Sequence, residues 1–147
     1  MAEPAGVRRL HVESDVERLA EVRAFVRDFS TSLGASPRAV DDLVQATDEA
    51  SCNIMIHGYA GNPGPIDVAI ERRGEAIAVT LSDRARTFDP TSAATSERAA
   101  ALPNKPGHMG VGVMLLRTMM DEVHHAARPD GGNELTLVRS IDPGKEG

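Results

Sequence analysis

The sequence predicts an α+β fold in which helices cover one face of a mixed, mostly antiparallel sheet. Three observations carry this prediction. Residues 16–29 and 37–57 place apolar side chains at the three-and-four spacing of helices. Residues 66–81 alternate as two strands, and an Asp-Gly-Gly-Asn turn at residues 130–133 separates two further alternating segments. At 147 residues, the chain is predicted to form a single domain with flexible ends at residues 1–6 and 142–147.

Composition argues against several classes of protein. The formal net charge of −6 argues against nucleic acid as the main partner, because contacts to phosphates need a basic surface. The sequence has no apolar run of about 18 residues and no apolar signal core, so no membrane partner is predicted and a cytoplasmic location is expected. Cys52 is the single cysteine, so no intrachain disulfide can form, and a buried, reduced thiol is expected.

The first 34 residues are expected to hold an edge strand and a helix. Residues 7–13 alternate weakly, which predicts the strand. Ser14 and Glu17 have the spacing of a capping box, in which each side chain satisfies a free backbone N–H. The helix that they open is expected to end near Gly34, since glycine is common just past a helix C-terminus.

A second helix is predicted to begin with Ser36 as its N-cap and Pro37 at its first position, and to end near residues 57–58. Glu49, Asn53 and His57 recur every four residues and should form a polar stripe along it. In isolation, such a stripe is most often a solvated face. The stripe borders an apolar face formed by Val40, Leu43, Val44, Ala46, Ala50, Ile54 and Met55.

The second half of the chain is expected to be mainly strands. Residues 66–81 predict an antiparallel hairpin. Residues 90–106 are small and polar without a hydrophobic face, which predicts a loop, and residues 113–120 predict an apolar helix. The final strand pair is expected at residues 122–128 and 134–140.

Polar features fall at the ends of three of these elements. The helical stripe is the first, and Asp83, at the end of an apolar strand, is the second. The third is the glycine cluster at residues 107–112, which opens a helix and could bind phosphate through free backbone N–H groups. Alone this cluster equally fits close helix packing. It is not a Walker loop, and no strand directly precedes it as a Rossmann motif requires.

The order and spacing of these features resemble the GHKL (Bergerat-fold) ATPases. Within them, the chain looks most like the anti-sigma-factor serine/threonine kinases of bacterial stress and sporulation partner-switching systems. The resemblance covers residues 10–141 and leaves no room for a second domain. It implies a two-layer Bergerat-type sandwich. The motifs that carry it are DEASCNIMIHGY (48–59), DRARTFDP (83–90), GHMGVGVMLLRTMMDEVHH (107–125) and GGNELTLVRS (131–140).

The resemblance implies a role for each matching residue. Glu49 matches the acidic residue that activates the attacking hydroxyl, and Asn53 matches the asparagine whose oxygen binds Mg²⁺. Asp83 matches the aspartate that accepts a hydrogen bond from the adenine amino group. His57 matches a polar position near the phosphates, although a histidine stabilised by the helix dipole fits equally well. The remaining matches are Gly107, Gly110 and Gly112, which would close over the phosphates, and Thr136, near the adenine. A plain strand residue explains Thr136 better than a contact with the base does.

By the same resemblance, the protein is expected to use ATP and Mg²⁺ as a protein serine kinase and to act as an anti-sigma factor. It would sequester a sigma factor and phosphorylate a STAS-type anti-anti-sigma partner. Residues 90–106 would form the ATP lid. A homodimer, which is frequent in the family, is left open. His108, His124, His125 and Cys52 lack the spacing of metal ligands, so no further metal site is predicted.

One position departs from the family pattern, because Ala85 stands where the family's Asp-x-Gly motif has glycine. If the position needs a positive φ, alanine costs about 1 kcal/mol and weakens nucleotide binding. Ala85 therefore supports a second hypothesis, a regulatory module that binds its partner stoichiometrically with little or no nucleotide. A third hypothesis, the catalytic domain of a sensor histidine kinase, is less well supported, since the single preceding helix cannot supply a dimerisation hairpin.

Overall fold

The computed structural model describes residues 6–85 and 116–141, so the predictions for residues 86–115 and for the two ends of the chain lie outside it. Two long helices, α1 and α2, five strands and a helical turn at residues 116–119 form most of the described part. A 3-10 helix (Val16–Arg18) precedes α1, and a π-helix (Ile54–Gly58) follows α2. In chain order, the main elements are β1 (Arg8–Glu13), α1 (Leu19–Ser32), α2 (Pro37–Asn53), β2 (Pro65–Arg73), β3 (Ala76–Asp83), β4 (Glu122–Ala127) and β5 (Asn133–Ser140).

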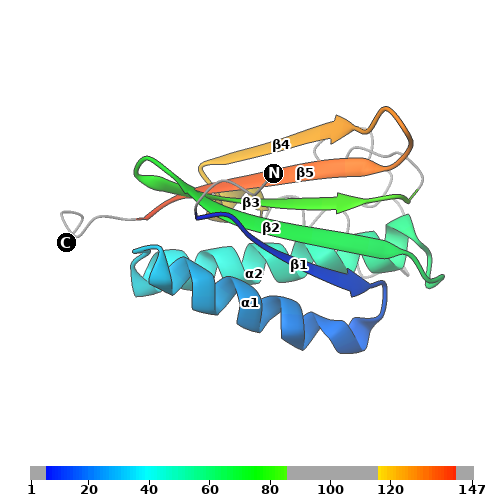
Figure 1. Ribbon diagram of the computed structural model, residues 1–147, viewed down its shortest axis with the longest axis horizontal. Helices are drawn as coiled ribbons and strands as arrows, with labels where there is room; N and C mark the ends of the chain where they lie inside the picture. Colours follow the sequence, from blue (N-terminus) through cyan, green and yellow to red (C-terminus); the bar gives the residue numbers. More distant parts are fainter. Residues whose placement is uncertain (1–5, 86–115, 142–147) are drawn as a thin grey trace.

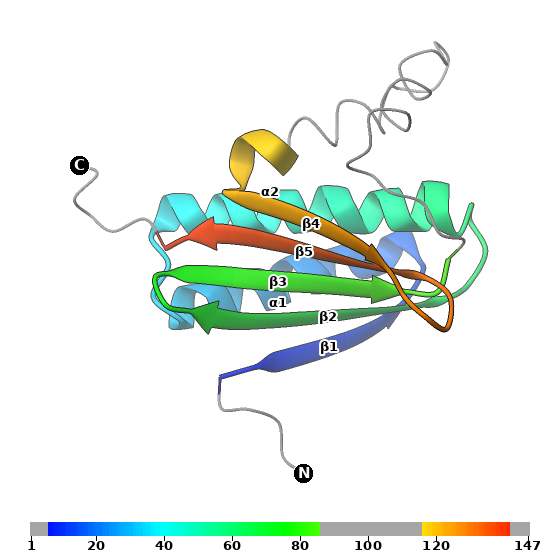
Figure 2. The same cartoon turned by 90° about the horizontal axis from the view of Figure 1, so that it is seen from above.

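The strands form one five-stranded sheet in the order β1-β2-β3-β5-β4, with antiparallel pairing between all neighbours. Both helices pack on the same face of this sheet (Figures 1 and 2). The predicted α+β architecture is therefore confirmed. The described strands form antiparallel pairs only, so the sheet contains no parallel pair among residues 6–85 and 116–141. The core between the layers is aliphatic, with Val22, Val26, Leu43, Ile77, Val79, Leu81 and Leu137 fully buried.

The start of the first helix differs by one residue from the prediction. Asp15, rather than Ser14, is the N-cap, and its carboxylate accepts a 2.9 Å hydrogen bond from the N–H of Glu17. The Ser14 N–H donates to the carbonyl of Gly64 at 2.7 Å, which extends the contact between β1 and β2. Because the backbone of Ser14 is still bonded to the residue before β2, the helix begins one residue later, with the side chain of Asp15 as its cap.

The second helix begins as predicted. The Ser36 hydroxyl accepts from the N–H of Ala39 at 3.0 Å, and Pro37 occupies the first helical position. The helical hydrogen bonding then changes after Asn53, where the N–H of Tyr59 donates to the carbonyl of Ile54 at 2.8 Å, five residues back. Such π-turns are rare and occur frequently at functional sites.

Polar contacts close the end of the interface where α2 begins. Arg139 of β5 donates two hydrogen bonds, of 3.1 and 3.0 Å, to the Asp42 carboxylate of α2, and both side chains are largely buried. The N–H of Ser36 donates to the carbonyl of Ile141 at 2.9 Å. Arg72 of β2 reaches the carbonyl of Leu33 at 2.9 Å. We call this set of contacts the closed end of the helix–sheet interface.

The sheet face opposite the helices is polar. His11 of β1 lies opposite Asp67 of β2, and their side chains are 2.7 Å apart, so the carboxylate raises the pKa of the imidazole. The hydroxyls of Thr80 and Thr136 lie 3.4 Å apart across β3 and β5. This face therefore carries the polar half of the period-two pattern.

Candidate functional site

A small cavity lies at the other end of the helix–sheet interface, where α2 stops and β3 ends. We call this region the open end. Half of the lining residues are apolar and half can form hydrogen bonds, so the cavity offers both kinds of contact. They come from α2 and the π-helix, from β3, β4 and β5, and from the helical turn before β4: Ala50, Asn53, Ile54, Asp83, Leu116, His125, Asn133 and Leu135.

A buried carboxylate lies at the centre of this cavity. Asp83 is 2% exposed and lies directly opposite Asn133 in the β3–β5 register. Its Oδ1 accepts hydrogen bonds from the side-chain amide of Asn133 at 3.0 Å and from the N–H of Ala85 at 2.8 Å. Burial raises the pKa of Asp83, and the hydrogen bonds from Asn133 and Ala85 and the charge of Arg128 oppose that shift. The site therefore holds a desolvated acceptor that retains capacity for a further N–H donor.

The backbone after Asp83 shows whether Ala85 is strained at the position where the family motif has glycine. Ala60 is the only non-glycine residue with positive φ in the described part of the chain, so Ala85 adopts an ordinary backbone conformation. Alanine at this position therefore carries no left-handed strain. Its side chain is buried and its N–H is held by Asp83.

The turn between β4 and β5 wraps tightly over the end of β3. A Cβ on Gly132 would lie 2.0 Å from the Asp83 carbonyl oxygen, and Gly132 has φ of +107°, so only glycine fits there. Arg128 donates to the same carbonyl at 3.1 Å, and Arg84 forms an ion pair with Asp130 at 3.0 Å. These contacts fix the last residue of β3 against the hairpin.

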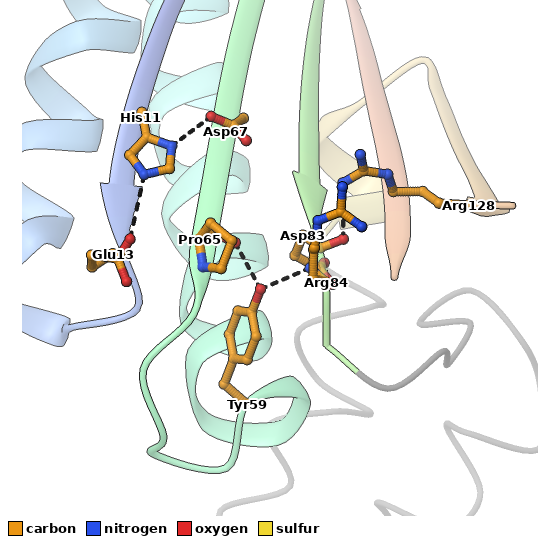
Figure 3. Close-up of polar contacts among 8 residues, drawn as sticks. All are labelled: His11, Glu13, Tyr59, Pro65, Asp67, Asp83, Arg84 and Arg128. Atoms are coloured by element: carbon orange, nitrogen blue, oxygen red, sulfur yellow. Dashed lines mark hydrogen bonds and ion pairs between the residues drawn. The ribbon is translucent and has the colours of Figure 1, made fainter. Parts of the chain in front are cut away.

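Tyr59 joins the end of the π-helix to the same segment, as Figure 3 shows. Its hydroxyl donates to the carbonyl of Pro65 at 2.7 Å and accepts from the N–H of Arg84 at 2.7 Å. Burial raises the pKa of the phenol, so the hydroxyl stays protonated and keeps both roles at neutral pH. The ring packs directly against Gly64, where a Cβ would lie 2.1 Å from a ring carbon.

Asn53 is the polar residue that α2 contributes to the cavity. It is 4% exposed, and its Nδ2 is buried without a hydrogen-bond partner among the described residues. An unsatisfied buried amide costs free energy comparable to a lost hydrogen bond, so such a group is typical of a site that a ligand completes. The structure thus brings Asn53 and Asp83 to one cavity, as the sequence predicted.

The other two residues of the predicted stripe lie outside the cavity lining. Glu49 is half-buried one turn before Asn53. His57 lies in the π-helix that follows α2. Cys52 is half-buried rather than buried, and burial together with the charges of Glu49 and Asp48 raises the pKa of its thiol.

The structure places Thr136 away from the cavity. Leu135 and Leu137 point into the core, so Thr136 lies on the opposite, polar face of the sheet with Thr80. This position fits the interpretation of Thr136 as a plain strand residue, and its contact with adenine stays an untested prediction. Asn133 is the β5 residue whose side chain contacts Asp83. Predictions for the glycine box at Gly107, Gly110 and Gly112, and for the lid at residues 90–106, lie outside the described residues.

Neither a bilayer-spanning helix nor a cluster of metal-ligating side chains is present in the described part of the chain. No helix in residues 6–85 and 116–141 has the length and apolarity needed to span a bilayer. In the same residues, no group of three or more His, Cys, Asp or Glu side chains is arranged to hold a metal ion.

The profile of the histidine kinase-like ATPase domain matches residues 12–139, which is nearly the whole chain. The chain belongs to the histidine kinase-like ATPase domain family. The crystal structure of the RsbU and RsbW domains of Rv1364c from Mycobacterium tuberculosis is similar, with a TM-score of 0.62 and 22% identity, and the alignment covers 90% of this chain and 32% of that one. The chain thus spans about a third of that protein, and the shared fold confirms the expected Bergerat-type architecture.

Curated relatives of this histidine kinase-like domain carry two kinds of name. The "Serine-protein kinase RsbW" of Bacillus licheniformis is 26% identical over 135 residues, which cover 86% of this chain and 80% of that protein. The "Anti-sigma F factor" of Anoxybacillus flavithermus is 22% identical, with 84% of each chain covered. That of Thermoanaerobacter sp. is 24% identical, with 84% of this chain and 85% of the other covered.

Sequence reasoning missed Asn133, His125 and Tyr59. Asn133 was assigned to a turn, although period-two alternation with Leu135 and Leu137 places it on the core face. That pattern could have identified it. His125 was considered only as a metal ligand. Tyr59 contacts Pro65 and Arg84 through the fold alone, and no local signal predicts either contact.

Proposed function

We propose that this histidine kinase-like domain is an ATP- and Mg²⁺-dependent protein serine kinase that also acts as an anti-sigma factor. It would sequester a sigma factor when free, and phosphorylate a serine of a STAS-type anti-anti-sigma partner, which inactivates that partner. The observation that carries the proposal is the open-end cavity, where a buried carboxylate and an unpartnered amide meet in a chain of this family. The names of the relatives support the choice of target.

The residues present fit an adenine nucleotide and a magnesium ion. Asp83 would accept from the exocyclic amine of adenine, because a buried carboxylate with remaining acceptor capacity selects an N–H donor. Asn53 would contribute its amide oxygen to Mg²⁺, because this cation takes oxygen ligands. The bound ion would supply charge neutralisation for phosphoryl transfer.

Glu49 is the proposed general base. It lies one helical turn before Asn53 and is half-buried, so a serine hydroxyl brought to the phosphate side of the site could transfer its proton to this carboxylate. His57, Gly107, Gly110 and Gly112 are proposed to lie on the phosphate side, and residues 90–106 to close over the nucleotide. The proposed serine phosphorylation follows from these roles.

A titration with ATP, with and without Mg²⁺, tests the nucleotide site. The wild-type protein should bind ATP in a Mg²⁺-dependent manner, and Asn53→Ala should lose that dependence. Asn62→Ala is a matched control, since Asn62 is exposed in the loop after the π-helix, outside the cavity lining. Absence of binding at millimolar ATP would favour the alternative function, a module that acts by stoichiometric binding alone.

Transfer of labelled γ-phosphate to a STAS-type protein tests the kinase. Glu49→Gln should abolish transfer while it preserves ATP binding, because the substitution removes only the proton acceptor. Glu75→Gln, in the exposed β2–β3 turn at the closed end, should transfer phosphate at the wild-type rate. Persistent phosphorylation by Glu49→Gln would exclude Glu49 as the base. The strain argument for a nucleotide-free module is weakened, because Ala85 has an ordinary backbone conformation.

A further inference from the structure

A chain of hydrogen bonds leads from the edge of the sheet to the buried carboxylate of the nucleotide cavity. Asn133 Nδ2 donates to Asp83 Oδ1 at 3.0 Å. The Oδ1 of the same amide lies 2.9 Å from Nε2 of His125, a half-buried residue of β4 that also lines the cavity. His125 and Asn133 share the helix-facing side of the sheet, since His125 pairs with the buried Leu135.

The chemistry of donors and acceptors fixes the direction of this chain. The ionised Asp83 carboxylate can only accept, so the group of Asn133 that faces it must be the NH₂. The amide oxygen of Asn133 therefore faces His125, and Nε2 of His125 must carry a proton. Both the neutral Nε2–H tautomer and the imidazolium meet this requirement, so the arrangement does not depend on the charge of His125.

We propose that His125 is a specificity-determining positioning residue of the nucleotide site, which acts through Asn133 to hold Asp83 as a fixed acceptor for an N–H donor on the base. This inference rests on the proposed ATP binding. Its physical reason is that an amide can rotate by a half-turn at little steric cost. The rotation would place the carbonyl of Asn133 against the Asp83 carboxylate. A donor at His125 prevents that rotation, because it binds the carbonyl.

The proposal has a consequence for the choice of base. Adenine presents an N–H donor at the position where guanine presents a carbonyl oxygen. A carboxylate held as an acceptor binds the first and repels the second. A carboxylate that is displaced or protonated no longer attracts the N–H of adenine and no longer repels the carbonyl oxygen of guanine. Loss of the His125 donor should therefore weaken ATP binding and relax discrimination against GTP, rather than weaken both nucleotides equally.

The test measures the dissociation constant for GTP divided by that for ATP, and compares this ratio between the wild type and variants. His125→Phe, which keeps an aromatic ring without a donor, should lower this ratio by about 10-fold or more, the effect of an unpaired polar group in a selective site. His125→Gln restores an N–H near the position of Nε2 and should return the ratio to within a few-fold of wild type. His124→Phe is the matched control, because His124 is exposed and contacts Glu122 at 2.7 Å, away from the cavity.

A second measurement needs neither a variant nor nucleotide. The ¹⁵N shifts of the wild-type imidazole should report a proton on Nε2 of His125, and a neutral Nδ1–H tautomer would overturn the proposal. An unchanged GTP-to-ATP ratio in folded His125→Phe would also overturn it, while ATP binding by the wild type would leave the proposed function intact. Failure of the wild type to bind ATP would instead remove the proposed function, and the role in base selection with it.

Discussion

The two ends of the interface between α2 and the sheet use the same elements in opposite ways. At the closed end, Arg139 and Asp42 satisfy each other with two hydrogen bonds, and Ser36 caps the helix. At the open end, the amide of Asn53 is unpartnered among the described residues, and Asp83 is buried with a raised pKa. The helix is regular at the first end and changes to a π-helix at the second.

The two ends of α2 therefore serve different purposes: the closed end stabilises the fold, and the open end is available for binding. Polar groups that are matched within the chain lower the free energy of the folded state. Polar groups that are buried without a match raise it, and a ligand that completes them gains affinity. We therefore expect substitutions at the closed end to change stability and substitutions at the open end to change nucleotide binding.

The largest effect is expected for Asp83→Asn, which should lower ATP affinity by about 100-fold or more, as loss of a buried polar contact does in selective sites. Its effect on stability depends on pH. Because burial raises the pKa of Asp83, the protonated form favours folding. That contribution is complete below the ordinary aspartate pKa of about 3.9 and is lost as the pH rises through the raised value.

Urea unfolding of wild type and Asp83→Asn across this pH range checks the sign. The free energy of unfolding of the wild type, relative to the variant, should decrease as the pH rises. A relative stability that increases with pH would mean that interactions with Asn133, Ala85 and Arg128 outweigh the burial of the carboxylate. ATP affinity, measured by calorimetry at neutral pH, gives the binding part of the prediction.

Arg139→Met probes the closed end and should lower the free energy of unfolding by about 1.5–3 kcal/mol, because it leaves Asp42 largely buried without its charged donor. The double variant with Asp42→Leu should recover part of this loss, since it removes the unpaired charge. ATP affinity should stay at the wild-type value in both. A large loss of affinity at unchanged stability would break the division between the two ends.

Tyr59→Phe should have a smaller effect on stability, about 1 kcal/mol, because one hydroxyl is lost from two hydrogen bonds. The N–H of Arg84 is then left without this acceptor, so the segment after Asp83 should loosen and ATP binding should weaken. Amide exchange at Arg84 measures the loosening directly. Unchanged exchange in a variant with weakened ATP binding would show that Tyr59 contributes by another route.

The smallest effect is expected for Ala85→Gly. Ala85 has an ordinary backbone conformation, so glycine relieves no strain and ATP affinity should change by less than about threefold. Calorimetric titration with ATP checks this value. A tenfold gain in affinity would show that the buried methyl group obstructs the nucleotide.

Local patterns predicted most of the fold. The Ser36 cap, the β2–β3 hairpin and the hairpin around residues 130–133 follow from residues close in sequence, and the structure reproduces them. Asn53 and Asp83 were identified because each lies at the end of a periodic segment. Their position in one cavity confirms that the two ends meet, while the roles assigned to them remain predictions.

The features that the sequence did not predict depend on pairing between distant segments. Asn133 contacts Asp83 only because β5 pairs with β3, and Thr136 lies on the other face for the same reason. The π-helix arises where the chain turns toward Tyr59, and apolar periodicity does not distinguish it from the end of an α-helix. The cap at Asp15 is not predicted because Ser14, its neighbour, is an equally good capping residue by sequence, and only the fold shows that the Ser14 N–H bonds to the carbonyl of Gly64.

The antiparallel sheet also has a consequence for self-association. Within residues 6–85 and 116–141, the two outer strands, β1 and β4, pair with a neighbouring strand on one side only, and such an edge can template the addition of further strands. Both edges carry exposed ionisable side chains, among them Arg8 and Arg9 on β1 and Glu122 and His124 on β4. If the outer strands of two molecules paired, their ionisable side chains would either approach side chains of like charge or lose contact with water. The outer strands thus protect a half-covered sheet against aggregation.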